Sequence, residues 1–256
     1  MSQTKEKIKI FSKFRPFVHG GEIDVHSNFV CSLYSDSNKR LRGILENKQL
    51  YAPNFTTFND AREGWFNAIY KQGISIKEVL DNMYERKLEK NICCFSEKFD
   101  DFEKNGKYRN HELLMWAHYA NSHLGLRIDF SVKEAFRRKY VKKVRYRQKI
   151  KDINIYEGKS YFHSEKNIID ILTRKDNVWE YEHEYRAILD NVCNNVDIDI
   201  ERIVLGRGFL PRVNYGENNI ACNLKCLVSA IKHILNDNKV KISMYKSRYD
   251  DELIDI

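Results

Sequence analysis

The residues from Trp179 to Arg186, WEYEHEYR, carry the densest group of chemically useful side chains in the sequence. Their period is that of a β-strand, in which successive side chains point to opposite faces. Glu180, Glu182 and Glu184 would then share one face with Arg186. A neighbouring negative charge raises the pKa of a carboxyl group, and such crowding is typical of reactive sites. We therefore expect Glu182 and Glu184 to face a concave surface. The alternative is an exposed polar face over a buried aromatic face.

A second group lies in the apolar segment Leu113–Phe130, where His118 and Tyr119 stand in a predicted helix. His118 could act as a general base or contact a nucleobase, and Tyr119 could stack on a planar ligand ring. Both residue types are also common as structural residues of a packed helix. The six cysteines include no CxxC pair, and the eight histidines include no HxxxH or HExxH arrangement. The sequence therefore predicts no metal site.

Residues 137–149, RRKYVKKVRYRQK, hold eight basic side chains and no acid. Tyr140 and Tyr146 lie between them. A basic run with interleaved aromatic residues can bind a phosphate backbone and stack on bases. The nucleic-acid contacts that we expect from this basic run are Arg138, Lys142, Arg145 and Arg147. An ordinary solvated surface is the alternative.

The chain has 256 residues, a formal net charge of +8 and 12% aromatic residues. This composition suits one folded domain and argues against disorder. No stretch is apolar enough for a transmembrane helix, and the N-terminus lacks the apolar region of a secretory signal, so we expect a cytoplasmic protein. GxGxxG, P-loop and GxSxG motifs are absent from the sequence, which argues against a Rossmann dehydrogenase, a nucleotide kinase and an α/β-hydrolase.

The periodicity of apolar residues predicts short helices and strands in a single α+β domain over residues 1–256. Strands are expected at Ile92–Ser96, Gly125–Phe130 and Tyr181–Leu189. Helices are expected at Ser75–Lys90, Asn110–Leu124 and Phe162–Lys175. We expect a central, split, mostly antiparallel sheet flanked by helices.

Several segments resemble a widespread bacterial family whose members are described only as a domain of unknown function. The matching segments are Lys13-Phe14-Arg15, LYAPNFTTFND (residues 50–60), ICCFSE, LMWAHYANSHLGLRIDF, KVRY and WEYEHEYR. The resemblance covers about residues 10–250, and the MWxHY and WxYExEYR blocks are its specific part. Proline usually follows FND in that family, whereas Ala61 stands there in this sequence.

The order of these blocks is similar to that of ADP-ribosyltransferases, which implies an ADP-ribosyltransferase-like fold. In those enzymes an early strand carries an Arg or His that grips NAD. A middle strand carries a Ser or Tyr, and a later strand carries a catalytic Glu, often in an E-x-E pair. The resemblance assigns the first role to Arg15, the second to Ser96 and the third to Glu182-x-Glu184.

The resemblance further implies that NAD is consumed as a substrate, without a metal. Glu184 would stabilise the positive charge that develops on the ribose as the nicotinamide bond breaks, and Glu182 would orient the nucleophile. Ser96 would hold Glu184 in place. The groups expected to bind NAD are Arg15 at the pyrophosphate and His118 or Tyr119 at the nicotinamide.

The implied activity is transfer of ADP-ribose from NAD to a protein or nucleic acid, or hydrolysis of NAD. A toxin or phage-defence role would suit it. Two other functions stay open. One is a non-catalytic nucleic-acid-binding protein that uses the basic run. The other is a metal-independent ribonuclease-like toxin with His118 and Glu184 as acid and base. Neither the acceptor nor the oligomeric state follows from the sequence.

Overall fold

The computed structural model describes residues 8–20, 28–58, 60, 63–70, 76–99, 109–148, 151–155, 165–210, 217–247 and 252–256. The chain divides into two compact units. Unit 1 comprises residues 1–50, 95–134 and 197–256, and unit 2 comprises residues 51–94 and 135–196. Each unit therefore combines segments that are distant in the sequence. The single domain expected over residues 1–256 stays a prediction.

The strands of unit 1 form a sheet around β5, which is buried along its whole length. β5 (Gly125–Ser131) pairs antiparallel with β1 (Phe11–Pro16) and with β12 (Asp199–Leu205). β12 pairs in parallel with β13 (Lys241–Tyr245), which pairs antiparallel with β14 (Leu253–Asp255). The apolar alternation of β5, with Leu126, Ile128 and Phe130 fully buried, explains its central place.

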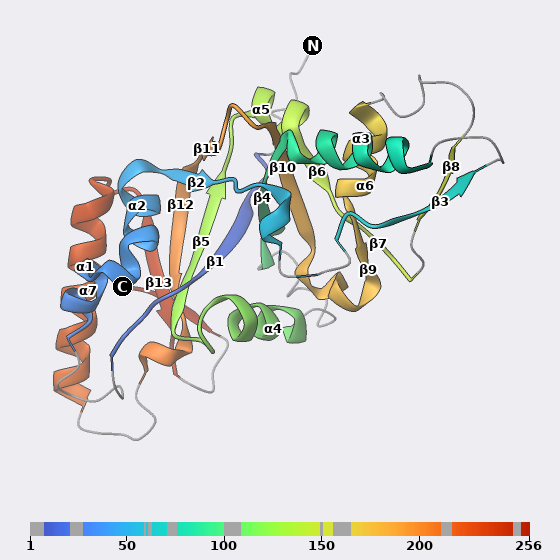
Figure 1. Ribbon diagram of the computed structural model, residues 1–256. Helices are drawn as coiled ribbons and strands as arrows, with labels where there is room; N and C mark the ends of the chain where they lie inside the picture. Colours follow the sequence, from blue (N-terminus) through green and yellow to red (C-terminus); the bar gives the residue numbers. More distant parts are fainter. Residues whose placement is uncertain are drawn as a thin grey trace, which may run out of the picture. The chain divides into compact units, whose positions relative to one another are not determined.

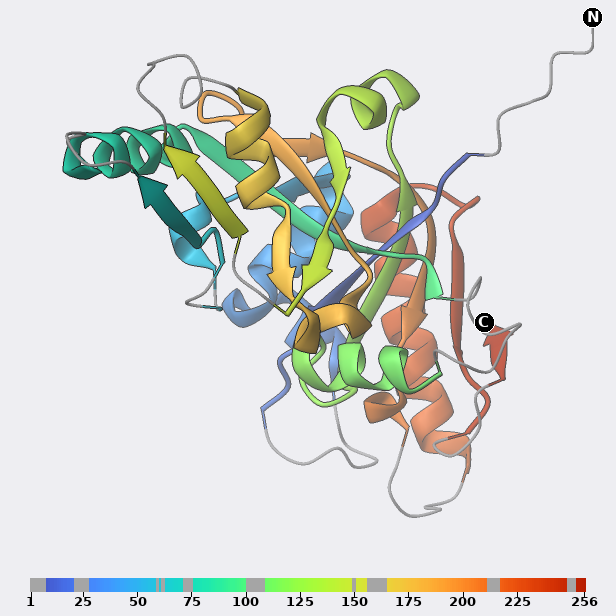
Figure 2. The same cartoon turned by 90° about the vertical axis from the view of Figure 1, so that its right-hand side faces the viewer.

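Helices cover both faces of the unit 1 strands (Figures 1 and 2). On one face, α1 (Phe29–Tyr34) and α2 (Lys39–Asn47) pack with α7 (Glu217–Leu235). On the other face, α4 (Arg109–Tyr119) crosses β1. In α2 the buried residues Leu41, Ile44 and Leu45 recur at helical spacing, which makes one face of the helix apolar. Two short 3-10 helices, η1 (Asp36–Asn38) and η6 (Arg207–Phe209), complete the unit.

The described residues of unit 2 form short strands and three α-helices. β3 (Phe66–Tyr70) pairs in parallel with β8 (Lys151–Ile155), and β7 (Arg145–Arg147) with β9 (Arg174–Asp176). β10 (Glu184–Asp190) pairs antiparallel with β6 (Val141–Lys143). The helices are α3 (Ile76–Leu88), α5 (Glu134–Tyr140) and α6 (Glu165–Leu172), with the 3-10 helices η2 (Phe55–Thr57) and η5 (Asn177–Glu182).

The core of unit 2 joins three of its segments. Ile92, Ile168, Leu172 and Ile188 form one buried apolar cluster, against which Phe58 packs. α6 supplies Ile168 and Leu172, and it also packs against α3 (Figure 1). This core fixes the positions of α6 and β10, and both elements lead into the candidate site described below.

The fold class expected from the sequence is confirmed as α+β, with an eight-stranded, mostly antiparallel sheet. The strand order is β14-β13-β12-β5-β1-β4 in unit 1 and β4-β10-β6 in unit 2, because β4 (Lys90–Glu97) has residues in both units. β2 (Gln49–Tyr51) and β11 (Asn195–Asp197) lie where the chain passes from one unit to the other. The strands expected at Ile92–Ser96 and Gly125–Phe130 are confirmed within β4 and β5.

The strand expected to begin at Tyr181 begins three residues later. Residues 177–182 form η5, His183 turns with a φ of 45°, and β10 starts at Glu184. The side chain of Asp176 accepts a hydrogen bond from the backbone N–H of Val178, which caps the helical turn.

This turn changes the arrangement expected for the glutamates. Glu180 and Glu182 do not share a strand face with Glu184, so that prediction is wrong for both. The prediction of a shared strand face is correct for Glu184 and Arg186, which lie two residues apart on β10. The expected concave surface is also wrong, since Glu182 and Glu184 are only 3% and 4% exposed.

Candidate functional site

Three glutamates and two cations meet in the interior of unit 2. We call this group the acidic cluster, and its members are Glu63, Lys175, Glu182, Glu184 and Arg186. Glu63 lies in a turn before β3, Lys175 on β9, Glu182 at the end of η5 and the last two on β10. Segments more than 100 residues apart thus supply one buried charged site.

The pair on β10 forms the best-defined contact of the acidic cluster. Arg186 Nε donates to Glu184 Oε1 over 2.8 Å and Nη2 donates to Oε2 over 3.1 Å, so the pair is bidentate. Arg186 Nη1 donates to the carbonyl of Leu172 over 2.6 Å. The Arg186 guanidinium lies 4.9 Å from the centre of the Phe58 ring, and Phe58 precedes the Asn and Asp of the FND motif. The FND and WEYEHEYR segments therefore meet at Arg186.

Lys175 is the centre of the acidic cluster. Its Nζ lies 2.7 Å from Glu182 Oε2, 3.0 Å from Glu63 Oε1 and 3.4 Å from Glu184 Oε2. It also lies 4.9 Å from the centre of the Trp179 ring. One ammonium group, with its three N–H donors, thus faces all three carboxylates.

Glu63 reaches the acidic cluster from a tight turn. The following residue, Gly64, has a φ of 73°, a conformation that residues with a Cβ rarely adopt. Lys87 Nζ donates to the carbonyl of Gly64 over 3.2 Å. Lys87 is itself only 8% exposed, and its Nζ lies 5.1 Å from the centre of the Phe55 ring. This contact fixes the turn that carries Glu63.

The charges of the acidic cluster shift the titration of its members. Burial alone would raise the pKa of Glu184, but Arg186 and Lys175 outweigh it and lower the pKa from 4.5 to about 2. The thiol of Cys94 also hydrogen-bonds Glu184 and lowers its pKa further. For Lys175 and Arg186, burial lowers the pKa, but the facing carboxylates raise it above the ordinary value in both. These three groups therefore stay charged at neutral pH.

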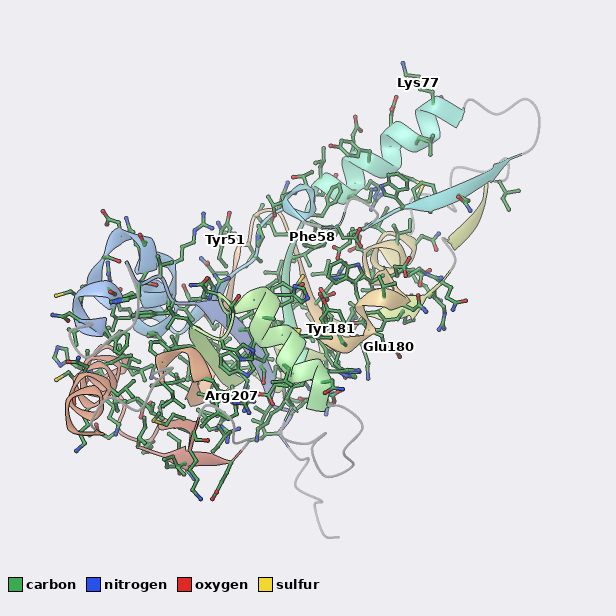
Figure 3. All side chains as sticks on the ribbon, turned by 90° about the horizontal axis from the view of Figure 1, so that it is seen from below. Tyr51, Phe58, Lys77, Glu180, Tyr181 and Arg207 are labelled. Carbon is green, nitrogen blue, oxygen red and sulfur yellow. The ribbon has the colours of Figure 1, made fainter. Side chains whose placement is uncertain are left out.

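Two tyrosines border the acidic cluster. The hydroxyl of Tyr146 accepts a hydrogen bond from the backbone N–H of Glu184 over 2.8 Å. Burial, together with the charge of Glu184, raises the pKa of Tyr146 well above its ordinary value. Burial and then the charge of Glu182 raise the pKa of Tyr181 to about 12. Tyr181 follows the exposed Glu180 on η5 (Figure 3), so η5 forms the partly exposed border of the cluster.

A second buried network lies in unit 1, where Trp116 of the MWxHY block donates from Nε1 to Glu112 Oε1 over 3.1 Å. Arg127 Nη1 lies 2.5 Å from Glu112 Oε1, and Nη2 donates to Asp129 Oδ2 over 3.1 Å. Arg202 also donates to Asp129, over 2.9 Å. The hydroxyl of Tyr245 donates to Glu112 over 2.9 Å, and the guanidinium of Arg207, labelled in Figure 3, lies 3.9 Å from the Tyr245 ring centre. Because the carboxylates have several donors each, this network ties α4 to β5, β12 and β13.

The other residues expected to take part in NAD chemistry lie in unit 1. Arg15 is half-buried on β1, and Ser96 is buried on β4 opposite Ser12. His118 is exposed and Tyr119 half-buried at the end of α4. Their expected roles with Glu182 and Glu184 stay predictions. Glu63 and Lys175 were not expected from the sequence; the nearest signal was the FND motif that precedes Glu63.

The basic run divides into α5, β6 and β7. Arg138, Lys139, Lys143 and Arg147 are exposed. Lys142 is half-buried, and its Nζ donates to the carbonyls of Arg138 and Lys139. Arg145 forms an ion pair with Asp170. Lys149 lies outside the described residues. The run is thus exposed in several of its members, and its binding role stays a prediction.

Residues 115–187 match the model of a protein family described as "Protein of unknown function (DUF2971)". The resemblance to a family of unknown function is thereby confirmed, and the matched range contains four of the five members of the acidic cluster. Comparison with curated proteins and with solved structures found no match. The resemblance to ADP-ribosyltransferases stays a prediction.

Within the residues that the structure describes, no three His, Cys, Asp or Glu side chains are grouped so as to hold a metal ion. None of the helices described combines the length and the hydropathy that a membrane crossing needs.

Proposed function

We propose that the protein is an NAD-consuming, ADP-ribosyltransferase-like enzyme whose chemical centre is the acidic cluster of unit 2. The observation that carries the proposal is the cluster itself: three carboxyl groups held by two cations in the interior, with Glu184 ionised far below neutral pH. Its formal charge is −1. Buried charge of this kind is costly to maintain and is common at sites of reaction.

The chemistry requires a fixed negative charge near the ribose. The bond between C1′ and the nicotinamide nitrogen breaks, and its electron pair leaves with nicotinamide. An oxygen or nitrogen of the acceptor, or of water, bonds to C1′, and the proton that it loses passes to a carboxylate. Positive charge develops on the ribose in this step, and a preorganised carboxylate stabilises it.

The roles proposed for individual residues follow the sequence, with one change. Glu182 accepts the proton of the nucleophile. Glu184 fixes Arg186, because both of its oxygens are already held by that guanidinium. The roles of Arg15, Ser96, His118 and Tyr119, which lie in unit 1, stay the predictions that the resemblance implies. A toxin or phage-defence effector is the setting that we propose for such an activity, since loss of NAD arrests a cell.

Nicotinamide release tests the proposal directly. Purified protein is incubated with NAD, and nicotinamide is measured by chromatography, with and without protein and RNA acceptors. Glu182→Gln should lower the rate by roughly 10²-fold, the scale for loss of one preorganised polar group. Glu180→Gln, which changes an exposed glutamate of the same segment, should leave the rate of nicotinamide release unaltered. No release by the wild type under any condition would refute the proposal.

A second candidate function rests on a different observation. Arg138, Lys139, Lys143 and Arg147 are exposed within ten residues of one another. We propose, as the alternative, a non-catalytic protein that binds nucleic acid through this run. Binding to RNA or DNA that falls steeply with salt, without any nicotinamide release, would favour this alternative.

A further inference from the structure

One oxygen of the acidic cluster has no hydrogen-bond donor among the residues that the structure describes. Glu63 Oε1 lies 3.0 Å from Lys175 Nζ and 3.0 Å from Arg186 Nη2. Glu63 Oε2 is buried, and none of the described residues is its hydrogen-bond partner. The side chain as a whole is 6% exposed. Buried carboxylate oxygens without a donor are costly and rare in native proteins, so such an atom indicates a place where a ligand or a water supplies the donor.

The cations of the acidic cluster have few donors left to supply it. Lys175 faces Glu63, Glu182 and Glu184 at once. Arg186 uses Nε and Nη2 on the glutamates and Nη1 on the carbonyl of Leu172. A phosphate needs donors from the protein, whereas a hydroxyl or amino group brings its own. Glu63 Oε2, as an acceptor, therefore suits a sugar hydroxyl better than a phosphate.

We propose that Glu63 is the substrate-facing carboxylate of the acidic cluster and that its Oε2 accepts a hydrogen bond from a hydroxyl of a substrate ribose. The inference rests on the proposed function and names the part of the nucleotide that the cluster binds. Glu184 then acts as a positioning residue that does not contact the substrate. It forms an ion pair with Arg186, and Arg186 forms an ion pair with Oε1 of Glu63. The ion pairs direct one oxygen of Glu63 toward the cations and leave the other for the ligand.

The variant Glu63→Gln separates binding from folding. A glutamine at this position can keep its carbonyl oxygen toward Lys175 and Arg186 and place its NH₂ group where Oε2 stands. The hydrogen-bond acceptor at this place is thereby replaced by a donor of nearly the same shape. Glu63→Asp, which keeps the charge but shortens the side chain, is the conservative comparison. Glu180→Gln is the matched control, because Glu180 is an exposed glutamate on η5.

The probes are ADP-ribose, measured by calorimetric titration, and NAD, measured by nicotinamide release. We expect Glu63→Gln to bind ADP-ribose about ten- to a hundredfold more weakly than the wild type, as for loss of a hydrogen bond to a charged group. Inorganic pyrophosphate should bind the variant and the wild type alike. Glu63→Asp should fall between them, and Glu180→Gln should match the wild type. The melting temperature of each variant shows whether it folds.

The outcomes distinguish this inference from the proposed function. Glu63-dependent binding of ADP-ribose without any nicotinamide release would support the inference and refute NAD consumption. Nicotinamide release that is equal in wild type and folded Glu63→Gln would overturn the inference and keep the function. Wild type that binds no ADP-ribose, with a water alone on Glu63 Oε2 in a crystal structure, would overturn the inference too. If Glu63→Gln fails to fold, Glu63→Asp decides by the same measurements.

Discussion

Replacing Glu184 with Gln should destabilise unit 2 strongly. The wild-type carboxylate accepts hydrogen bonds from Arg186 Nε and Nη2 over 2.8 and 3.1 Å. The amide of a glutamine has only one acceptor oxygen and no negative charge to pair with the guanidinium. A pKa lowered from 4.5 to about 2 corresponds to about 3 kcal/mol, at about 1.4 kcal/mol per pKa unit. That figure agrees with the cost of about 3–5 kcal/mol for breaking a buried ion pair. The melting temperature should fall by roughly 6–12 °C.

The effect should depend on pH in one direction. The folded-state pKa of Glu184 lies below its unfolded value, so its contribution is present above pH 4.5 and lost as the pH falls to about 2. The free energies of unfolding of wild type and Glu184→Gln, measured in urea, should therefore converge over this range. Glu180→Gln is the control. Equal stability of Glu184→Gln and wild type at pH 7 would refute the reasoning and return Glu184 to the role of an accessible reactive carboxylate.

Two further variants test other contacts. Burial lowers the pKa of Lys87, so the folded protein binds fewer protons there than the unfolded chain, and the stability of wild type relative to Lys87→Met should rise as the pH climbs toward 10.5. Urea unfolding of both proteins between pH 7 and 10.5 measures this, and a constant difference would contradict it. If the basic run binds nucleic acid, Arg147→Ala should lower the slope of log affinity against log salt by about one. Arg145→Ala should change that slope little, because the Arg145 guanidinium already pairs with Asp170. Equal slopes for wild type and Arg147→Ala would assign the exposed run to ordinary surface.

Local patterns were enough to predict the regular elements. The helix at Ser75–Lys90 and the strand at Gly125–Phe130 appear as α3 and β5, because each has an apolar period that its neighbours in the fold support. The strand predicted at Tyr181–Leu189 starts three residues too early, because the alternation of polar and aromatic residues over Tyr181–His183 fits both a strand and a short 3-10 helix. Asp176 was the local signal for the helical turn, since its side chain caps η5.

The acidic cluster could be predicted only in part. Glu184 and Arg186 share a strand face, which the period of two implies. Glu63 lies 123 positions before Arg186 and reaches it only because of the tertiary fold. A single sequence has no local pattern that pairs such distant residues. The expected direction of the pKa shift was wrong: crowded glutamates suggested a raised pKa, but Arg186, together with the unexpected Lys175, lowers the pKa of Glu184.

The sharing of Lys175 among three glutamates restricts how this protein can change over generations. Loss of a carboxylate removes an ion-pair partner of Lys175, and loss of Glu184 also removes the bidentate partner of Arg186. Loss of Lys175 leaves three buried carboxylates that repel one another. Each single replacement therefore removes buried contacts that no other group restores, so a lineage leaves this arrangement through a less stable intermediate or through paired replacements. Positions 63, 175, 182, 184 and 186 should therefore vary together among descendants of this sequence, even though position 63 is far from the other four along the chain.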